Sequence, residues 1–166
     1  MKILGKIANL FFDILIFIIF VFLLLAIYNF IMLNVFKHSY TNYFGYTYFE
    51  ILTGSMRDEI DVDDYVFVKI TKDVKEHDII SYTSGDTVIT HRITSINDEE
   101  IITKGDFNNT YDDPITKDDV IGKVIFIGHK YGKFMKFITE PIVFGPILIT
   151  IILFNLAFNE RKKEGV

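Results

Sequence analysis

Residues 47–56 read Thr-Tyr-Phe-Glu-Ile-Leu-Thr-Gly-Ser-Met, and the expected fold is built outward from this stretch. From Thr47 to Thr53 the side chains alternate with a period of two residues, which is the period of a β-strand. Gly54 then allows the backbone to approach a neighbour closely. The stretch therefore predicts a strand that runs into a tight turn and presents one hydroxyl, that of Ser55.

Further β-strand patterns follow, and turn residues separate them. They cover residues 65–70, 78–83, 87–96, 101–104 and 120–127. No repeat and no helical periodicity interrupts them. The sequence thus predicts a mainly β domain of about six to eight strands, and about a hundred residues are enough to bury a core of that kind.

Long uncharged runs lie on both sides of this domain. Residues 14–36 carry no formal charge over 23 positions, and about 20 helical residues cross a hydrocarbon layer of roughly 30 Å. We expect a transmembrane helix there; a cleaved signal peptide is the alternative, although its apolar region would be shorter. Residues 141–158 form a second uncharged run that contains Pro141 and Pro146. They predict a second transmembrane helix, with a buried core segment as the alternative.

These runs divide the chain into three parts. Residues 1–37 form a lead and a transmembrane helix, residues 38–136 the β domain, and residues 137–166 the second helix with a basic tail. Basic residues precede the first run and follow the second, so the positive-inside rule places both termini in the cytoplasm. We therefore expect a multi-pass protein of the cell membrane, or of the endoplasmic reticulum if eukaryotic, with its β domain on the extracytoplasmic side.

Charge and composition exclude several classes of function. Residues 38–136 contain 18 Asp and Glu against 11 Lys and Arg, and this acidic balance argues against a nucleic-acid partner. The chain has no cysteine, which excludes disulfides, thiol catalysis and cysteine-ligated metals. No cofactor and no metal site is expected.

One of the four histidines lies inside a strand pattern. His91 shares a strand face with Ile89 and Ile93, so its imidazole needs a hydrogen-bond partner. The bland interpretation is a structural histidine bonded to backbone. The other interpretation is a general base, because a serine nucleophile needs a base within hydrogen-bond reach, and the base needs an anion to orient it. Ser55, His91 and either Asp106 or Asp112 can supply these groups, although aspartates are also common turn residues.

Four ordered segments together carry more information than any single residue. They are Thr53-Gly-Ser-Met56, Thr90-His-Arg-Ile93, Thr103-Lys-Gly-Asp-Phe-Asn-Asn109 with Asp112, and Ile121-Gly-Lys-Val124. In this set the chain resembles the type I signal peptidases, in the branch found in the endoplasmic reticulum, in archaea and in some Gram-positive bacteria. The resemblance covers roughly residues 10–128 and implies a signal-peptidase-type β catalytic domain.

The resemblance also implies an activity. It is that of a membrane-bound serine endopeptidase, which cleaves signal peptides from secretory preproteins after small-x-small sites. Ser55 would be the nucleophile and His91 the general base. Asp106 or Asp112 would orient His91, with Asp113 as a third candidate. The Ser55 N–H and the Thr53 hydroxyl would hold the oxyanion. Candidate partners are preproteins, the lipid bilayer, and the secretion translocon or accessory subunits.

Two alternatives are open, one from another class and one a serine peptidase of the same broad fold. The chain could be a degenerate, membrane-anchored β module that binds signal sequences or secretion partners, or a peptidase like the self-cleaving repressors. The latter are soluble and use a lysine base, which disfavours them here. One departure concerns the turn after the serine, where signal peptidases usually have Glu-Pro and this chain has Arg57-Asp58. The loss of proline raises the question of what makes that turn rigid.

Overall fold

The computed structural model describes residues 2–97, 100–129, 145–146 and 149–152. The chain separates into two compact units, one made of Met1–Val35 with Lys136–Val166 and the other of Phe36–Met135. The first unit contains α1 (Lys2–Phe30) and the π-helical turn η1 (Ile31–Val35). The second contains β1 (Tyr46–Glu50), β2 (Tyr65–Ile70), β3 (Ile79–Ser84), β4 (Thr87–Ile96), β5 (Ile101–Lys104) and β6 (Val120–Gly128).

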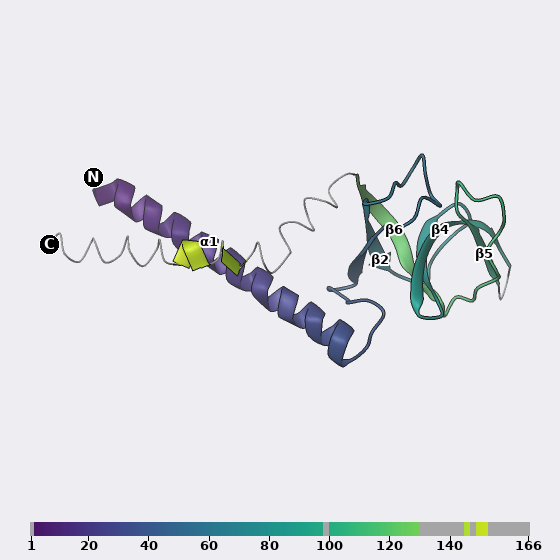
Figure 1. The fold of residues 1–166 in the computed structure, drawn as a ribbon, viewed down its shortest axis with the longest axis horizontal. Coiled ribbons are helices and arrows are strands. Elements are labelled where there is room, and N and C mark those ends of the chain that lie inside the picture. Colours follow the sequence, from purple (N-terminus) through teal and green to yellow (C-terminus); the bar gives the residue numbers. More distant parts are fainter. Residues whose placement is uncertain (1, 98–99, 130–144, 147–148, 153–166) are drawn as a thin grey trace. The chain divides into compact units, whose positions relative to one another are not determined.

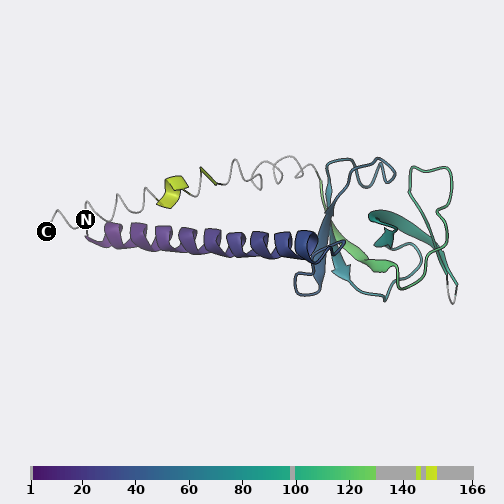
Figure 2. The same ribbon diagram turned by 60° about the horizontal axis from the view of Figure 1, so that its bottom comes forward.

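After Asp13 helix α1 is apolar on all sides, and Figures 1 and 2 show the helix as one unbroken ribbon. The segment Leu10–Val35 is long and apolar enough to cross a membrane, and its side chains are almost all exposed. A helix of a water-soluble protein would instead bury one apolar stripe. The segment therefore fits a membrane span, and its N-terminal position also fits a signal sequence.

The second predicted span lies mostly outside the described residues. Within residues 141–158 the structure describes only 145–146 and 149–152, which are helical. Among the residues described at this end of the chain, no helix long enough to cross a membrane is found. The multi-pass topology and the sidedness of the β domain stay predictions.

The second unit is an antiparallel sheet with the strand order β1-β2-β6-β3-β4-β5, as the strands in Figure 1 show in part. The prediction of a mainly β domain is thereby confirmed, and most strand ends agree with the sequence patterns to within a residue. The exception is β1, which ends at Glu50 and not at Thr53. Of residues 51–53, only Ile51 still forms backbone hydrogen bonds of this kind. Its N–H donates to the Asp64 carbonyl and its carbonyl accepts from the Asp63 N–H, both at 2.9 Å.

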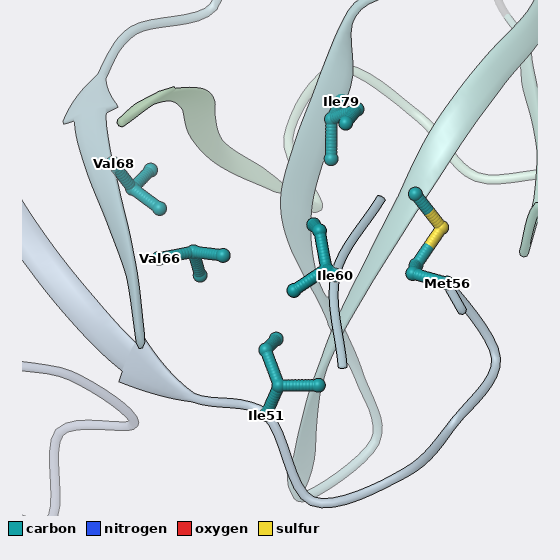
Figure 3. Packing of buried hydrophobic residues seen from close by; sticks show 6 residues of the cluster. All are labelled: Ile51, Met56, Ile60, Val66, Val68 and Ile79. Carbon is teal, nitrogen blue, oxygen red and sulfur yellow. The ribbon is translucent and has the colours of Figure 1, made fainter. Parts of the chain in front are cut away.

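Two hydrophobic clusters stabilise the domain. Successive side chains of a strand point to opposite faces, so neighbouring residues Ile79 and Ile80 of β3 belong to different clusters. The first cluster comprises Ile51, Met56, Ile60, Val66, Val68 and Ile79, whose side chains converge in Figure 3. The second comprises Ile80, Tyr82, Ile93, Ile101, Ile115 and Val120. The first cluster fixes the chain on both sides of Ser55, and the second packs around the strand that carries His91.

Candidate active site

Ser55 lies in a turn that two buried side chains hold in place. After Ile51 the chain leaves the sheet, and the Ile60 N–H donates to the Met56 carbonyl at 2.8 Å. Met56 and Ile60 are 1 % and 0 % exposed, so the turn is anchored directly after the serine and again five residues later. Ser55 itself is half-buried, which leaves its hydroxyl accessible.

A chain of hydrogen bonds joins Ser55, His91 and Asp112. The Ser55 Oγ lies 2.9 Å from the His91 Nε2, and the His91 Nδ1 lies 2.6 Å from the Asp112 Oδ2. A carboxylate can only accept, so the Nδ1 of neutral His91 carries the proton and its Nε2 is free to accept from the serine hydroxyl. This is the arrangement of a nucleophile, a base and an orienting anion.

The backbone at Gly105 lies close to both the serine and the histidine. A Cβ atom added there would lie 2.6 Å from the Ser55 carbonyl oxygen and 2.9 Å from the His91 Nε2. Both distances are shorter than van der Waals contact, and one of the two atoms belongs to backbone that cannot rotate away. A glycine at 105 is therefore required for the loop after β5 to close over the site.

Asp112 is held by more than the histidine. The Thr103 hydroxyl donates to the Asp112 Oδ2 at 2.7 Å, and the Tyr82 hydroxyl donates to the same oxygen at 3.2 Å. Both donors are buried, Thr103 at 0 % and Tyr82 at 1 % exposure. Burial, together with the negative charge of Asp112, raises the pKa of Tyr82 to about 12, so its hydroxyl keeps its proton.

Asp106 forms no hydrogen bond with His91; both residues lie in the described part of the chain. It forms a two-pronged ion pair with Arg92, in which the Arg92 Nε donates to Oδ1 at 3.0 Å and Nη2 donates to Oδ2 at 2.7 Å. Glu59 binds the same guanidinium group, which also donates to the His77 carbonyl at 3.1 Å. The hydrogen bonds that Arg92 donates to Asp106 raise the pKa of Arg92 despite its partial burial, so the guanidinium stays charged. Of the aspartates that the sequence left open, the structure brings Asp112 to the imidazole, Asp106 to Arg92, and leaves Asp113 exposed.

Several contacts tie the serine turn to the loop after β5. The Phe107 N–H donates to the Ser55 carbonyl at 2.9 Å, and the Asp106 N–H points to the Met56 sulfur at 3.4 Å. The Arg57 guanidinium lies over the Phe107 ring, 5.7 Å from its centroid. These contacts supply the rigidity that a proline would otherwise give.

Proline does not fit this turn at position 58. Asp58 has a φ of 78°, in the left-handed region, whereas the proline ring fixes φ near −65°. Aspartate tolerates left-handed backbone better than most residues. The Arg57-Asp58 pair therefore accompanies a different turn conformation.

The predicted oxyanion donors lie beside the serine. The exposed Thr53 hydroxyl is 3.3 Å from the Ser55 Oγ. Among the hydrogen bonds found within the described chain, none uses the Ser55 N–H. Both groups are thus available to an oxygen that develops negative charge next to the nucleophile. No cluster of three or more metal-binding side chains occurs in the described ranges.

The sequence assigned no role to Tyr82, Thr103 or Arg92, although the last two lie within the four ordered segments. Strand pairing together with strand alternation could have pointed to the first two. The pairings Ile80 with His91 and Ile93 with Thr103, combined with strand alternation, place both hydroxyls on the sheet face of His91. What the sequence lacked was the register of these hairpins, which depends on the whole sheet.

Comparison with known proteins adds no relative: no protein-family model matches this chain, and no curated protein does. The resemblance to signal peptidases consequently rests on the four sequence segments alone.

Proposed function

We propose that this chain is a membrane-anchored serine endopeptidase of the signal peptidase type, which removes signal peptides from secretory preproteins. The observation that carries the proposal is the continuous hydrogen-bond chain from the Ser55 Oγ through His91 to Asp112, at 2.9 and 2.6 Å. An ordinary surface serine hydroxyl bonds to water or to nearby backbone, whereas the Ser55 hydroxyl bonds to an imidazole that a carboxylate orients.

In the first half of the proposed reaction, the Ser55 oxygen attacks the scissile carbonyl carbon while its proton moves to the His91 Nε2. Asp112 stabilises the imidazolium that forms. The carbonyl oxygen gains negative charge and accepts hydrogen bonds from the Ser55 N–H and the Thr53 hydroxyl. The C–N bond then breaks, the departing amine takes the proton from the His91 Nε2, and the signal peptide stays attached to Ser55 as an ester.

In the second half, a water molecule replaces the amine. It gives a proton to the His91 Nε2 and attacks the ester carbon. The bond to the Ser55 oxygen breaks, and the proton passes from His91 back to that oxygen. The products are a free signal-peptide carboxylate and the unchanged enzyme, so no cofactor enters the cycle.

The strand edges beside the site suit an extended substrate. β1, which leads to Ser55, pairs only with β2 among the described strands. β4 pairs with β5 only from Arg92 onward, so the edge of residues 87–91 that faces away from β3 has no described partner. A peptide segment that adds a strand there would meet the nucleophile and the base at its scissile bond. Preference for small side chains at that bond is what the family resemblance implies.

The test is a processing assay with the full chain in membranes and a precursor that carries an Ala-x-Ala site. We expect cleavage by the wild type and loss of about 10⁴-fold or more in rate for Ser55→Ala and for His91→Ala. Ser84→Ala, at an exposed strand end, is the matched serine control and keeps full activity.

The degenerate binding module makes the opposite prediction. In that case wild type and Ser55→Ala would bind the precursor equally and neither would cut it. Cleavage by Ser55→Ala at the wild-type rate would also exclude the proposed role of the serine.

A further inference from the structure

Asp112 sits on a segment without regular structure, between β5 and the isolated bridge at Ile115. A carboxylate on such a segment has no strand or helix to fix its direction. Its side chain is 21 % exposed, so water could compete for it. Yet the His91 Nδ1 contact requires one oxygen to stay in one place.

Thr103 holds Asp112 at two points. Its carbonyl accepts from the Asp112 N–H at 2.9 Å, and its hydroxyl donates to the Asp112 Oδ2 at 2.7 Å. Thr103 belongs to β5, pairs with Ile93 of β4 and is fully buried. The residue therefore transmits the position of the sheet to the backbone and to the carboxylate of Asp112.

Tyr82 holds the same oxygen from another strand. Its ring belongs to the second hydrophobic cluster, and its hydroxyl reaches the Asp112 Oδ2 at 3.2 Å and the Thr103 hydroxyl at 3.1 Å. Three groups, from β3, β4 and β5, thus converge on one carboxylate oxygen: the Tyr82 hydroxyl, the His91 Nδ1 and the Thr103 hydroxyl.

We propose that Tyr82 and Thr103 are positioning residues, whose hydroxyls fix the Asp112 carboxylate and thereby the tautomer of His91. The kinetic part of this inference rests on the proposed function; the tautomer part does not. Without the hydroxyls the carboxylate turns toward water, and the His91 proton distributes between Nδ1 and Nε2. An Nε2–H tautomer cannot accept the serine proton.

A purely structural role predicts something different. A buried tyrosine or threonine hydroxyl needs a partner for stability alone, and its removal would then lower the free energy of unfolding without changing His91. The state of the imidazole in the folded protein separates the two roles.

The first readout is the ¹⁵N spectrum of histidine-labelled full-length protein in detergent micelles, under alkaline conditions. The chain has four histidines, so each imidazole can be assigned by substitution. We expect the Nδ1–H form of His91 in the wild type, and a mixture that contains the Nε2–H form in Tyr82→Phe and Thr103→Val. Thr103→Ser keeps the hydroxyl and restores the wild-type spectrum.

The second readout is precursor cleavage. Tyr82→Phe should lower kcat about tenfold, and Tyr82→Phe combined with Thr103→Val should lower kcat about 10²-fold. KM should stay unchanged, because neither hydroxyl touches substrate. The matched control is Ser81→Ala. Ser81 neighbours Tyr82, is equally buried and bonds the Thr90 hydroxyl at 2.8 Å on the other sheet face. It should change neither kcat nor the His91 spectrum.

The proposal is overturned if folded Tyr82→Phe and Thr103→Val keep the wild-type tautomer and kcat, or if Ser81→Ala changes them equally. Thr103→Ser guards against a Thr103→Val chain that does not fold. If the wild type cuts no precursor but the tautomer shifts as expected, the positioning role stands and the proposed function fails.

Discussion

Two of the three aspartates in the loop after β5, Asp106 and Asp112, lie six positions apart in surroundings that differ in kind. Asp112 accepts from an imidazole and from two buried hydroxyls. Asp106 faces a permanently charged guanidinium that Glu59 also binds. Asp112 thus faces an imidazole that can take up a proton. Asp106 faces a guanidinium that cannot release one.

Under the proposed function, this difference separates a catalytic role for Asp112 from a structural role for Asp106. His91 gains a proton during the proposed reaction, so the charge of Asp112 acts on the transition state. Arg92 has the same charge throughout, so the Asp106 pair acts on the shape of the loop and on the adjacent strand. Two aspartates that look equivalent in sequence therefore predict very different mutational effects.

The largest expected effect is that of removing the Asp112 charge. Asp112→Asn should lower kcat by about 10⁴-fold, because an amide cannot stabilise the imidazolium and can hold the wrong tautomer. The matched variant Asp106→Asn should lower kcat by less than about tenfold. Both are measured by precursor cleavage at equal amounts of inserted protein.

Equal losses of kcat in the two variants would contradict the distinction between Asp112 and Asp106. A larger loss for Asp106→Asn would reverse it and would make Asp106 the group that orients His91.

The next largest effect is expected at Gly105, whose backbone lies close to Ser55 and His91. Gly105→Ala adds a methyl group that meets the Ser55 carbonyl and the His91 Nε2. The serine-to-imidazole distance should increase, and a displacement of about 1 Å costs roughly 10²-fold in rate. The control is Gly85→Ala: Gly85 lies at an exposed turn where the added Cβ meets nothing within 4 Å, although its φ of 57° strains alanine. If Gly105→Ala cleaved precursor at the wild-type rate, the close approach of the loop would be irrelevant to the site.

A smaller effect, on stability, is expected from the ion pairs of Arg92 with Asp106 and Glu59. Arg92→Met removes the partner of Asp106 and Glu59, and should lower the free energy of unfolding by about 1 kcal/mol, since partly exposed pairs contribute little. Thermal unfolding in detergent measures this loss. The activity of the folded variant should fall less than that of Asp112→Asn. Stability equal to that of the wild type would show that this ion pair does not hold the loop.

The smallest effect is expected at Asp78, whose role is structural only. Burial alone would raise the pKa of Asp78, but hydrogen bonds from Lys123 at 2.6 Å and from the Lys75 N–H at 3.0 Å outweigh it and lower the pKa below 3.8. Asp78 thus stabilises the fold fully above pH 3.8, and this contribution is lost as the pH falls through the lower folded value.

Lys123→Met should therefore begin to unfold at a slightly higher pH than the wild type on acid titration. Intrinsic tyrosine fluorescence in detergent detects the transition, and at neutral pH precursor cleavage should be unchanged. Identical acid transitions would show that Lys123 does not lower this pKa.

Much of the fold was predictable because strand alternation is local. The patterns at 87–96 and 101–104 are those of β4 and β5, since β-branched residues, which favour strands, are concentrated there. The end of β1 was not predictable, because what draws Leu52 and Thr53 out of the sheet is the burial of Met56 and Ile60 in a cluster with β2 and β3. Likewise, the left-handed backbone of Asp58 depends on that tertiary anchoring.

The candidate site divides in the same way. Ser55 and His91 stood out by their sequence context, but the choice between Asp106 and Asp112 required knowing which way the loop turns. Tyr82 and Thr103 carry no local signal, because a hydroxyl in a strand is ordinary until the register shows what it faces. Register is a property of the whole sheet, so these residues become visible only in three dimensions.

The most direct test of the account is to trap the intermediate on Ser55. The full chain in membranes is mixed with an Ala-x-Ala precursor, and the reaction is quenched in acid within one turnover. The protein is then digested, and the masses of its fragments are measured by mass spectrometry. The account predicts an added mass equal to the signal peptide less one water on the fragment that contains Ser55, absent in Ser55→Ala and in His91→Ala. Precursor cleavage by the Ser55→Ala chain at the wild-type rate, or an adduct on any other residue, would contradict it.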